Sequence, residues 1–439
     1  MDDLDTLAVD RELRKCCERW VGYRRALQAG RVPASDPFTP SRWVLGRKTF
    51  YELGELEHDP IAPAVRRWVY RLTEQRVNSD LSLELSKRLY RDEHAIAEPE
   101  DGRFTLAALL RQGLAVGPKP ALWLGQALKH TEQVQETVLQ LWERRQELAA
   151  RFALSSPDAL SAPCENLYEH AERWVTASEA PWQTSAIITP AALIEQALGD
   201  PGRLEWPARL VPRVLLDFFA DTRLLEALEL DPGRLPAALA PTSYMRALAR
   251  LGAAFCDANA PKDQPFSIAH DAWGLERRRH GAIFGLLLLN AEFLRRHFGA
   301  SREAIRQARR SLGTSLLIAS RIAALRVLSR RAALSGRKAF LESFEERTVR
   351  VCRVELPLRT AGVFMRLHDD DPQRFAGLLL GAAASQRLTE SHDEDWFRNP
   401  RAVDQLRSEA ALPPCFDANP DELARGADVL GRLIEGSVV

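Results

Sequence analysis

Apolar residues at helical spacing run along nearly all of the 439 residues, and this pattern constrains the fold more than any other feature. In residues 302–334, Ile305, Leu312 and Leu316 recur on one helical face, and Ser301 stands where a helix N-cap would. The same spacing predicts further helices at 7–29, 63–90, 120–152, 242–257, 279–298, 337–353, 373–388, 401–411 and 420–436. The best strand candidate is 349–356. We therefore predict an all-α fold.

Prolines divide the helical pattern into parts. Residues 157–240 contain closely spaced prolines, each of which disfavours a continuing helix, so short helices and turns are expected there. We predict an N-terminal helical region at 1–156, a proline-rich connecting region at 157–240, and a C-terminal helical region at 241–439. The connecting region would form a rim or hinge between two helical halves.

Composition excludes several classes of protein. The chain is 46% hydrophobic and 27% charged, as soluble globular proteins are, and its formal net charge is zero. Its longest strongly apolar run, 281–289, is far shorter than the roughly 20 residues of a membrane span. The six cysteines show no C-x-x-C pair, and we find no phosphate-binding glycine loop. We expect a bacterial cytoplasmic protein with reduced thiols, no membrane association and no cofactor.

The segment 248–255 carries the most specific motif signal. Ala249, Arg250, Leu251, Gly252 and Ala253 occupy the frame in which oligopeptidases of the thimet and oligoendopeptidase type (M3-like) carry His-Glu-x-Gly-His. In those enzymes two histidines one helical turn apart hold Zn²⁺, and the glutamate activates the bound water. Alanine offers no lone pair to a metal, and arginine is a poor proton acceptor near neutral pH. The segment thus resembles a zinc-peptidase helix without its ligands.

This resemblance implies a large helical stack in two halves around a cleft. The family takes its third zinc ligand from a glutamate about two dozen residues after the second histidine, and Glu276 lies near that spacing. Because arginines follow Glu276 directly, we favour an ion-paired glutamate over a surviving ligand. The competing interpretation of 244–256 is an ordinary amphipathic core helix, and neither interpretation retains zinc hydrolysis.

Charge is distributed unevenly along the chain. Residues 275–353 contain eighteen basic side chains against six acidic ones, whereas 388–439 contains eleven acidic side chains against five arginines. We expect the acidic tail to pack on the basic helices and neutralise them. The alternative is an anion or nucleic-acid site in the basic segment 277–338. Its candidate residues are Arg277, Arg278, Arg279, Arg306, Arg309 and Arg310.

Two acidic clusters, 368–371 and 392–395, each begin with a histidine. Dense carboxylates can bind Mg²⁺ or Ca²⁺, but consecutive side chains point in different directions and cannot all reach one ion. Asp371-Pro372 is also typical of a helix start, where negative charge is favourable. We favour helix capping and expect a metal site only if the two clusters meet in space.

The sequence leads to one main functional hypothesis. We expect a non-catalytic, peptidase-like helical scaffold that binds a peptide or protein partner, with no catalytic and no metal-binding residues. The alternative is the anion- or nucleic-acid-binding module at 277–338, which we do not favour. The sequence leaves the oligomeric state open.

Overall fold

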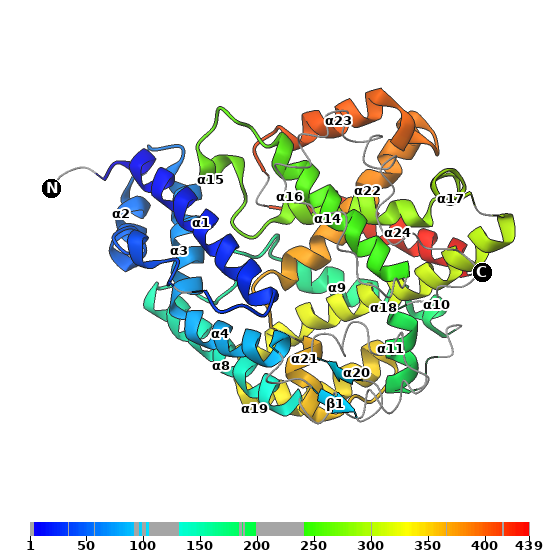
Figure 1. The fold of residues 1–439 in the computed structure, drawn as a ribbon, viewed down its shortest axis with the longest axis horizontal. Coiled ribbons are helices and arrows are strands. Elements are labelled where there is room, and N and C mark those ends of the chain that lie inside the picture. The colour runs from blue at the N-terminus through cyan, green and yellow to red at the C-terminus, as the bar shows by residue number, and fades with distance from the viewer. Residues whose placement is uncertain are drawn as a thin grey trace.

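The structure is a computed structural model of the whole chain, and nearly all of its secondary structure is helical (Figure 1). Two short strands, β1 and β2, pair in antiparallel register with Ile96 opposite Phe104. The structure describes residues 4–33, 35–56, 58–91, 96–98, 102–104, 131–183, 187, 189–198, 241–299, 301–365, 367–414 and 417–438.

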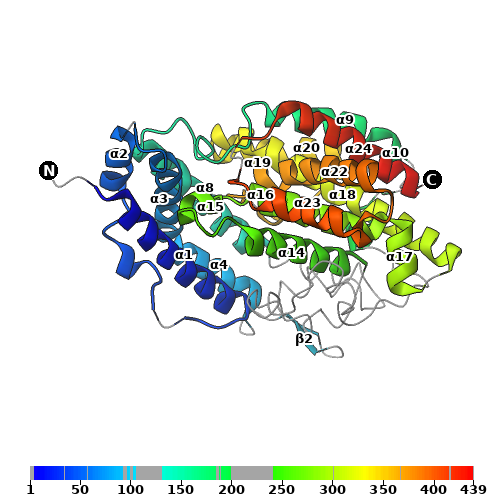
Figure 2. The same ribbon diagram turned by 90° about the horizontal axis from the view of Figure 1, so that it is seen from above.

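The elements of the first half of the chain begin at one end of the molecule, and the later ones lie beside helices of the second half (Figures 1 and 2). They are α1 (Thr6–Gln28), α2 (Arg47–Glu55), α3 (Ala62–Val77), α4 (Ser79–Tyr90), β1 (Ile96–Glu98), β2 (Gly102–Phe104), α8 (Thr131–Arg151), α9 (Leu167–Ala177), α10 (Glu179–Gln183) and α11 (Pro190–Leu198).

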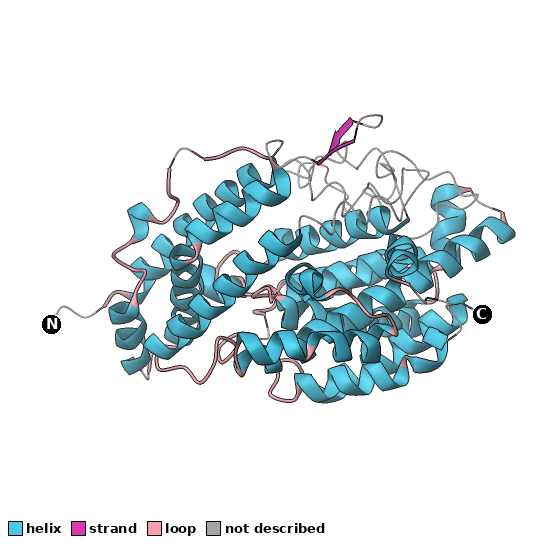
Figure 3. Cartoon of the chain, turned by 90° about the horizontal axis from the view of Figure 1, so that it is seen from below, coloured by secondary structure: helices cyan, strands magenta, loops and turns pink. Residues whose placement is uncertain are grey.

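The second half of the chain forms the larger group of helices. They are α14 (Pro241–Asn259), α15 (Phe266–Ala269), α16 (Leu275–Leu286), α17 (Ala291–Phe298), α18 (Arg302–Leu334), α19 (Arg337–Glu342), α20 (Phe344–Cys352), α21 (Ala361–Met365), α22 (Asp371–His392), α23 (Pro400–Ala410) and α24 (Pro420–Val438). The cartoon in Figure 3 shows how completely helices dominate the described chain.

The predicted all-α class is confirmed, and several helices match their predicted bounds. Helix α18 begins after Ser301, whose side chain accepts the Ala304 N–H as an N-cap. Three predicted helices are each split into shorter ones, and in the predicted 63–90 helix Asn78 separates α3 from α4. A 3-10 turn ends α16, and Asn290 then caps α17 by accepting the Phe293 N–H. Ser343 separates α19 from α20. The first residues of the predicted 120–152 helix lie outside the described residues.

The predicted strand at 349–356 is wrong. Val349 to Cys352 form the last turn of α20, which ends at Arg353 with a left-handed φ of 52°. Val351 and Cys352 are fully buried against the C-terminal core, so a helix satisfies both their burial and their backbone hydrogen bonds. The β-branched residues that suggested a strand are therefore accommodated in a helix by tertiary packing.

Two separate apolar cores confirm an arrangement in two helical parts. The smaller core joins side chains of α1, α2 and α3 to Leu148 and Phe152 at the end of α8 and to Ala272 and Trp273 before α16. The larger core is built mainly from α9, α14, α16, α18, α22 and α24. Helix α8 enters both cores, so the predicted boundaries at 156 and 240 do not coincide with them and stay a prediction. Residues 199–240 of the connecting region lie outside the described residues.

Helix α14 packs on α16, α16 packs on α22, and α22 packs on α24. Glycines permit the close approach of these helices. A Cβ on Gly281 of α16 would lie 2.8 Å from the carbonyl oxygen of Ala249 on α14. A Cβ on Gly252 of α14 would collide with the His280 carbonyl, and one on Gly426 of α24 with the backbone of Leu379. The glycines thus fix the positions of α14 and α16, which carry the candidate site.

Helix α18 is long and apolar enough to cross a membrane by length and composition. It does so although the longest strongly apolar run of the sequence is the shorter segment 281–289. Its most apolar 18-residue window is 67% buried inside the protein. It contacts α9, α11, α22 and α24, with Leu312 and Leu317 fully buried. This is the packing of a central core helix.

Candidate functional site

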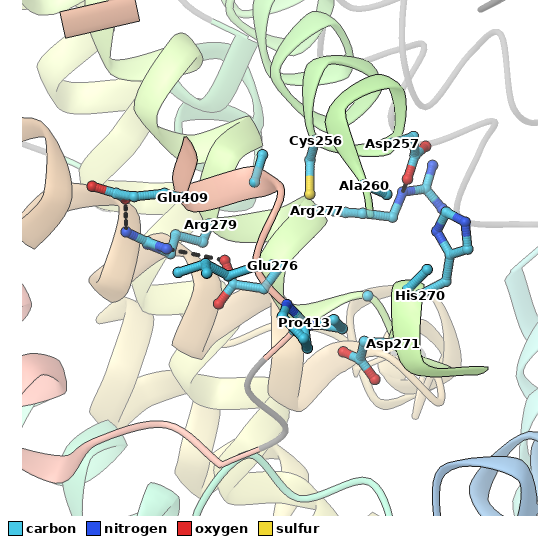
Figure 4. Close-up of a pocket in the computed structure, with 15 residues that line it drawn as sticks. Cys256, Asp257, Ala260, His270, Asp271, Glu276, Arg277, Arg279, Glu409 and Pro413 are labelled. Carbon is cyan, nitrogen blue, oxygen red and sulfur yellow. Dashed lines mark hydrogen bonds and ion pairs between the residues drawn. The ribbon is translucent and has the colours of Figure 1, made fainter. Parts of the chain in front are cut away.

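A pocket of about 280 Å³ lies where the larger apolar core borders the smaller one (Figure 4). Its walls come from the last turns of α14, the end of α15, the first turn of α16, and the end of α23 with the segment after it. His270 and Asp271 line the pocket and directly precede Ala272 and Trp273 of the smaller core. The volume is close to the lower end of the range for ligand pockets, roughly 300 Å³.

Local hydrogen bonds set the geometry of the α15–α16 wall. The Asp10 carboxylate on α1 accepts the N–H groups of Phe266 and Ser267 at 2.8 Å each, which fixes the start of α15. The Asp271 carboxylate accepts the Trp273 and Leu275 N–H groups at 3.0 and 2.6 Å and so anchors the start of α16. Burial raises the pKa of Asp271 although these bonds oppose the rise.

Every other carboxylate of the pocket is paired with a cation. Asp257 on α14 lies 3.0 Å from Arg277, and Glu276 lies 3.0 Å from Arg279. Glu409 on α23 pairs with Arg279 as well. Burial alone would raise the pKa of Glu409, but Arg279 outweighs it and holds the pKa below its usual value. Both arginines of the pocket are thus engaged by carboxylates, so the pocket offers no unpaired cation to an anionic ligand.

His270 and Cys256 offer the remaining polar atoms of the pocket. Burial lowers the pKa of His270, which favours a neutral imidazole, and its ring packs on Phe266 with centroids 5.2 Å apart. The described part of the chain supplies no hydrogen bond to its ring nitrogens, whereas its carbonyl accepts the Trp68 indole N–H at 2.9 Å. Burial raises the pKa of Cys256 to about 12, so this thiol is protonated and a poor nucleophile.

The rim of the pocket is apolar. Leu412, Pro413 and Pro414 follow α23 and line one side, and the Leu412 side chain is 64% exposed. An apolar rim around an imidazole and paired charges suits a ligand that has both an apolar side chain and hydrogen-bonding groups. Within the described residues, the pocket brings together no three metal-ligating atoms.

Of the predicted zinc-motif positions, Glu276 lines this pocket, whereas Ala249, Arg250 and Ala253 lie outside its lining, on the helix whose last turns form one wall. Ala249 packs against α16, with its Cβ 3.7 Å from where a Cβ on Gly285 would lie. Ala253 is half-buried and Arg250 is exposed. None of the three lines the pocket, but Ala249 and Ala253 share a helical face with Cys256, one turn further along α14. Glu276 lines the pocket and is paired with Arg279.

The six arginines proposed as an anion site are not gathered in one place. Arg277 and Arg279 line the pocket, whereas Arg278 pairs with Asp370 elsewhere. Arg306 pairs with Glu303 on its own helix at 2.8 Å, and Arg309 and Arg310 follow it on the first turns of α18. No ion pair or hydrogen bond in the described chain connects the arginines of α18 with those of α16.

The acidic tail neutralises little of the basic segment 275–353. Within the described residues, the ion pair between Arg279 and Glu409 is the one that links them. Most other partners come from earlier parts of the chain. They include Glu136 and Glu143 for Arg337, Asp158 for Arg330, Glu172 for Arg350, and Glu179 for Arg321 and Arg353. The tail does pack on the basic segment, through α24 on α18, but the expected neutralisation by its carboxylates is largely wrong.

The two acidic clusters do not meet. They lie at opposite ends of the 22-residue helix α22, which spans about 33 Å at 1.5 Å per residue. His392 is near Gln405, with 2.9 Å between ring nitrogen and amide oxygen. At the other end the predicted helix start is confirmed, but Asp371 is the first helical residue and Pro372 the second, so Asp371 is not the N-cap that the sequence predicted. The N-cap is Asp370, whose side chain makes no capping hydrogen bond and instead pairs with arginines.

The group of buried ion pairs around Asp369 and Asp370 was not predicted from the sequence. Asp369 pairs with Arg71, which lies 298 positions earlier in the chain. No spacing rule connects residues so far apart, so the sequence contains no local signal of this contact.

Comparisons with known proteins identify the fold. No protein-family model and no curated protein matches the sequence. Among solved structures, the chain is similar to a Pyrococcus furiosus carboxypeptidase, with a TM-score of 0.52 and 11% identity over 99% of both chains. It is also similar to PZ peptidase A, with a TM-score of 0.55 and 10% identity over 98% of this chain and 85% of the other. An M32 carboxypeptidase from Deinococcus radiodurans gives 0.51 and 13%, over 98% and 97%.

These similarities extend over nearly the whole chain, so they concern the complete architecture and not one shared motif. Identities of 10–13% are informative about the fold alone. The protein therefore has a large helical fold like that of these peptidases.

Proposed function

We propose that this protein is a non-catalytic, peptidase-like scaffold that binds a peptide or an extended protein segment in the pocket between α14, α16 and the segment after α23. The bacterial cytoplasm is the compartment we propose for it. The observation that carries the proposal is the chemistry of α14. Where the resembling peptidases place zinc ligands, this helix has Ala249 and Ala253, and its last turns line a pocket whose thiol, Cys256, is not activated.

The pocket suits a peptide better than a charged small molecule. Its carboxylates and arginines are paired with one another, so a ligand gains more from amide hydrogen bonds and apolar contact than from net charge. The His270 imidazole can donate to or accept from a peptide group. The exposed Leu412 side chain can cover an apolar side chain of the ligand.

The same pairing favours a peptide over nucleic acid. A nucleic-acid site needs several unpaired cations along one surface. Arg277 and Arg279 are engaged by Asp257, Glu276 and Glu409, and Arg306 by Glu303.

Screening a library of fluorescent peptides by polarisation tests the proposal. We expect a subset containing an apolar residue to bind, and His270→Ala and Leu412→Asp each to weaken that binding by about tenfold, the effect of losing roughly 1.4 kcal/mol. Leu334→Asp is the matched control, because Leu334 is an exposed leucine (43%) at the end of α18 and should not matter. Equal loss in all three variants, or no binding peptide at all, would contradict the proposal.

A further inference from the structure

A second charged site lies where the N-terminal helices meet the first turns of α16 and α22, and we call it the junction cluster. Its centre is the pair Asp369 and Asp370, at the start of α22. Asp369 pairs with Arg71 of α3, accepts the Gln75 amide N–H at 2.8 Å, and lies 4.0 Å from Arg145 of α8. These contacts join two parts of the chain with separate apolar cores.

Asp370 is held from the C-terminal side. Arg278 of α16 and Arg374 of α22 both pair with it, the latter at 2.9 Å. His368 lies 2.5 Å from Asp370 and 2.6 Å from Asp369. Burial would lower the pKa of His368, but the two carboxylates outweigh it and raise the pKa, so the ring favours its cationic form.

Arg24 of α1 is the one cation of the junction cluster without a carboxylate partner among the described residues. Its guanidinium carbon lies 4.9 Å from the centre of the Trp20 ring, and that of Arg71 lies 5.5 Å from the same ring. The two guanidinium groups therefore flank one buried indole. Burial, together with Arg71 and Arg374, lowers the pKa of Arg24 although Asp369 and Asp370 oppose the change. Arg24 is thus short of negative charge.

Cations outnumber carboxylates in the junction cluster as a whole. Arg24, Arg71, Arg145, Arg278, Arg374 and protonated His368 are the cations, and Glu74, Asp369, Asp370 and Asp371 are the carboxylates. Among the described residues, two positive charges therefore remain uncompensated. The same imbalance is seen at Arg278, whose pKa is lowered by burial and by Arg374 although Asp370 is its partner.

Solvent reaches the excess charge. The side chains of Arg278, Arg374 and His368 are 42%, 34% and 38% exposed, whereas Asp369 and Arg71 beneath them are almost completely buried. A small anion can therefore approach the cations from outside without opening the buried ion pairs. Guanidinium groups offer pairs of N–H donors that match the geometry of a phosphoryl or carboxylate group.

We propose that the junction cluster binds a doubly charged oxyanion, a phosphoryl group, held by Arg24 from the N-terminal part and by Arg278 and Arg374 from the C-terminal part. Two uncompensated positive charges match a dianion better than a monoanion. The ligand bridges the two parts of the fold, so its binding stabilises their contact. This site is separate from the peptide pocket, and either proposal can fail without the other.

A metal ion suits the junction cluster less well. Within the described chain, the ligating atoms of His368, Asp369 and Asp370 do lie within 4.8 Å of one another. The carboxylates are already paired with Arg71, Arg278 and Arg374, and a divalent cation would add to an existing positive excess.

Calorimetric titration of the full-length protein with inorganic phosphate tests this proposal, at constant ionic strength set with NaCl. We expect phosphate to bind and acetate to bind at least about tenfold more weakly. Arg24→Gln should weaken phosphate binding by about tenfold or more, and it leaves no buried carboxylate unpaired, so the protein should still fold. Arg306→Gln is the matched control, since Arg306 pairs only with its neighbour Glu303, and it should bind phosphate as the parent does.

The same experiment distinguishes a phosphoryl group carried by a larger molecule from free phosphate. Tighter binding of phenyl phosphate than of phosphate would support a group carried by a larger molecule, and tighter binding of phosphate would support the free ion. Equal affinity for acetate and phosphate would overturn the proposal. So would phosphate binding that is unchanged in both Arg24→Gln and Arg278→Gln.

Discussion

The pocket and the junction cluster are both served by one helix, α16, yet their charges are arranged differently. Arg277 and Arg279 turn into the pocket, where Asp257, Glu276 and Glu409 match them. Arg278, between them in sequence, turns to the junction cluster, where cations exceed carboxylates. Three consecutive arginines thus reach two sites of opposite character, because neighbouring residues on a helix point about 100° apart.

This difference shows why a run of like charges in a sequence is a poor guide to a binding site. The charge that decides affinity is the remainder after the fold has paired its own residues. In the pocket no positive charge remains unpaired, whereas in the junction cluster two do among the described residues.

Asp369→Asn should have the largest effect on stability. Asp369 is 4% exposed and compensates Arg71 and Arg145 from two other helices, so the variant leaves these two buried cations to share the single carboxylate of Glu74. We expect the free energy of unfolding to fall by about 3–5 kcal/mol, measured by urea denaturation. Asp404→Asn is the control: Asp404 is 68% exposed and pairs with Arg407 on the same helix, so a change within about 0.5 kcal/mol is expected. Similar losses in both variants would mean that the ion pairs of the junction cluster stabilise the fold no more than an exposed ion pair does.

Acid should weaken the junction cluster. Burial would raise the pKa values of Asp369 and Asp370, but Arg71, Arg374 and His368 outweigh it and lower both well below the usual value. Carboxylates with lowered pKa values stabilise the fold above their unfolded-state pKa, near 3.8, and lose this contribution as pH falls through the folded-state values.

We therefore expect the free energy of unfolding to fall below about pH 4, by about 1.4 kcal/mol for each unit of pKa depression. The loss should be smaller in Asp369→Asn. Burial raises the pKa of Asp257 and Asp271 in the pocket, so these two groups should oppose the loss. Denaturation curves at a series of pH values measure this, and a stability that is flat between pH 5 and 3 would contradict it.

Gly252→Ala tests the helix pairing on which the pocket is built. The new methyl group would collide with the His280 carbonyl, so α14 and α16 must separate, at a cost of about 1–3 kcal/mol. Peptide binding should fall as well, because Cys256 and Asp257 would shift relative to Glu276. Gly22→Ala is the control: no atom lies within 4 Å of its added Cβ in α1, and the change should stabilise by about 0.5–1 kcal/mol. Full stability in Gly252→Ala would refute the close contact.

Arg24→Gln should have the smallest effect on the free protein. Arg24 has a lowered pKa and no carboxylate partner in the described chain, so removing its charge should change the free energy of unfolding by less than about 0.5 kcal/mol, or raise it. Thermal denaturation without phosphate measures this. A large loss of stability would show that Arg24 stabilises the fold through an ion pair. The junction cluster would then have no excess cation, and it would not differ from the pocket in this respect.

Local patterns were sufficient to predict most of the helices. Ser301 and the apolar stripe of α18 identified that helix to the residue, and Asp371-Pro372 marked the start of α22. The prediction failed where tertiary packing determines the secondary structure. It did not foresee the break at Asn290 between α16 and α17, and it assigned Val351 to a strand although this residue is buried in a helix.

The site was predictable only in part. Glu276 was expected to be ion-paired and is, because its partner Arg279 lies one turn away. The contacts of Asp257 with Arg277, of Glu409 with Arg279, and of Arg71 with Asp369 join residues 20 to 298 positions apart. Such pairs depend on how helices cross, which no spacing rule in one sequence determines.

Incubation of the purified protein with excess Zn²⁺ and a peptide library, read by mass spectrometry, tests the central claim most directly. Ala249 and Ala253 cannot ligate a metal, so we predict that every peptide stays intact while the peptides identified by polarisation remain bound. Cleavage that depends on added zinc and stops on chelation would contradict the account.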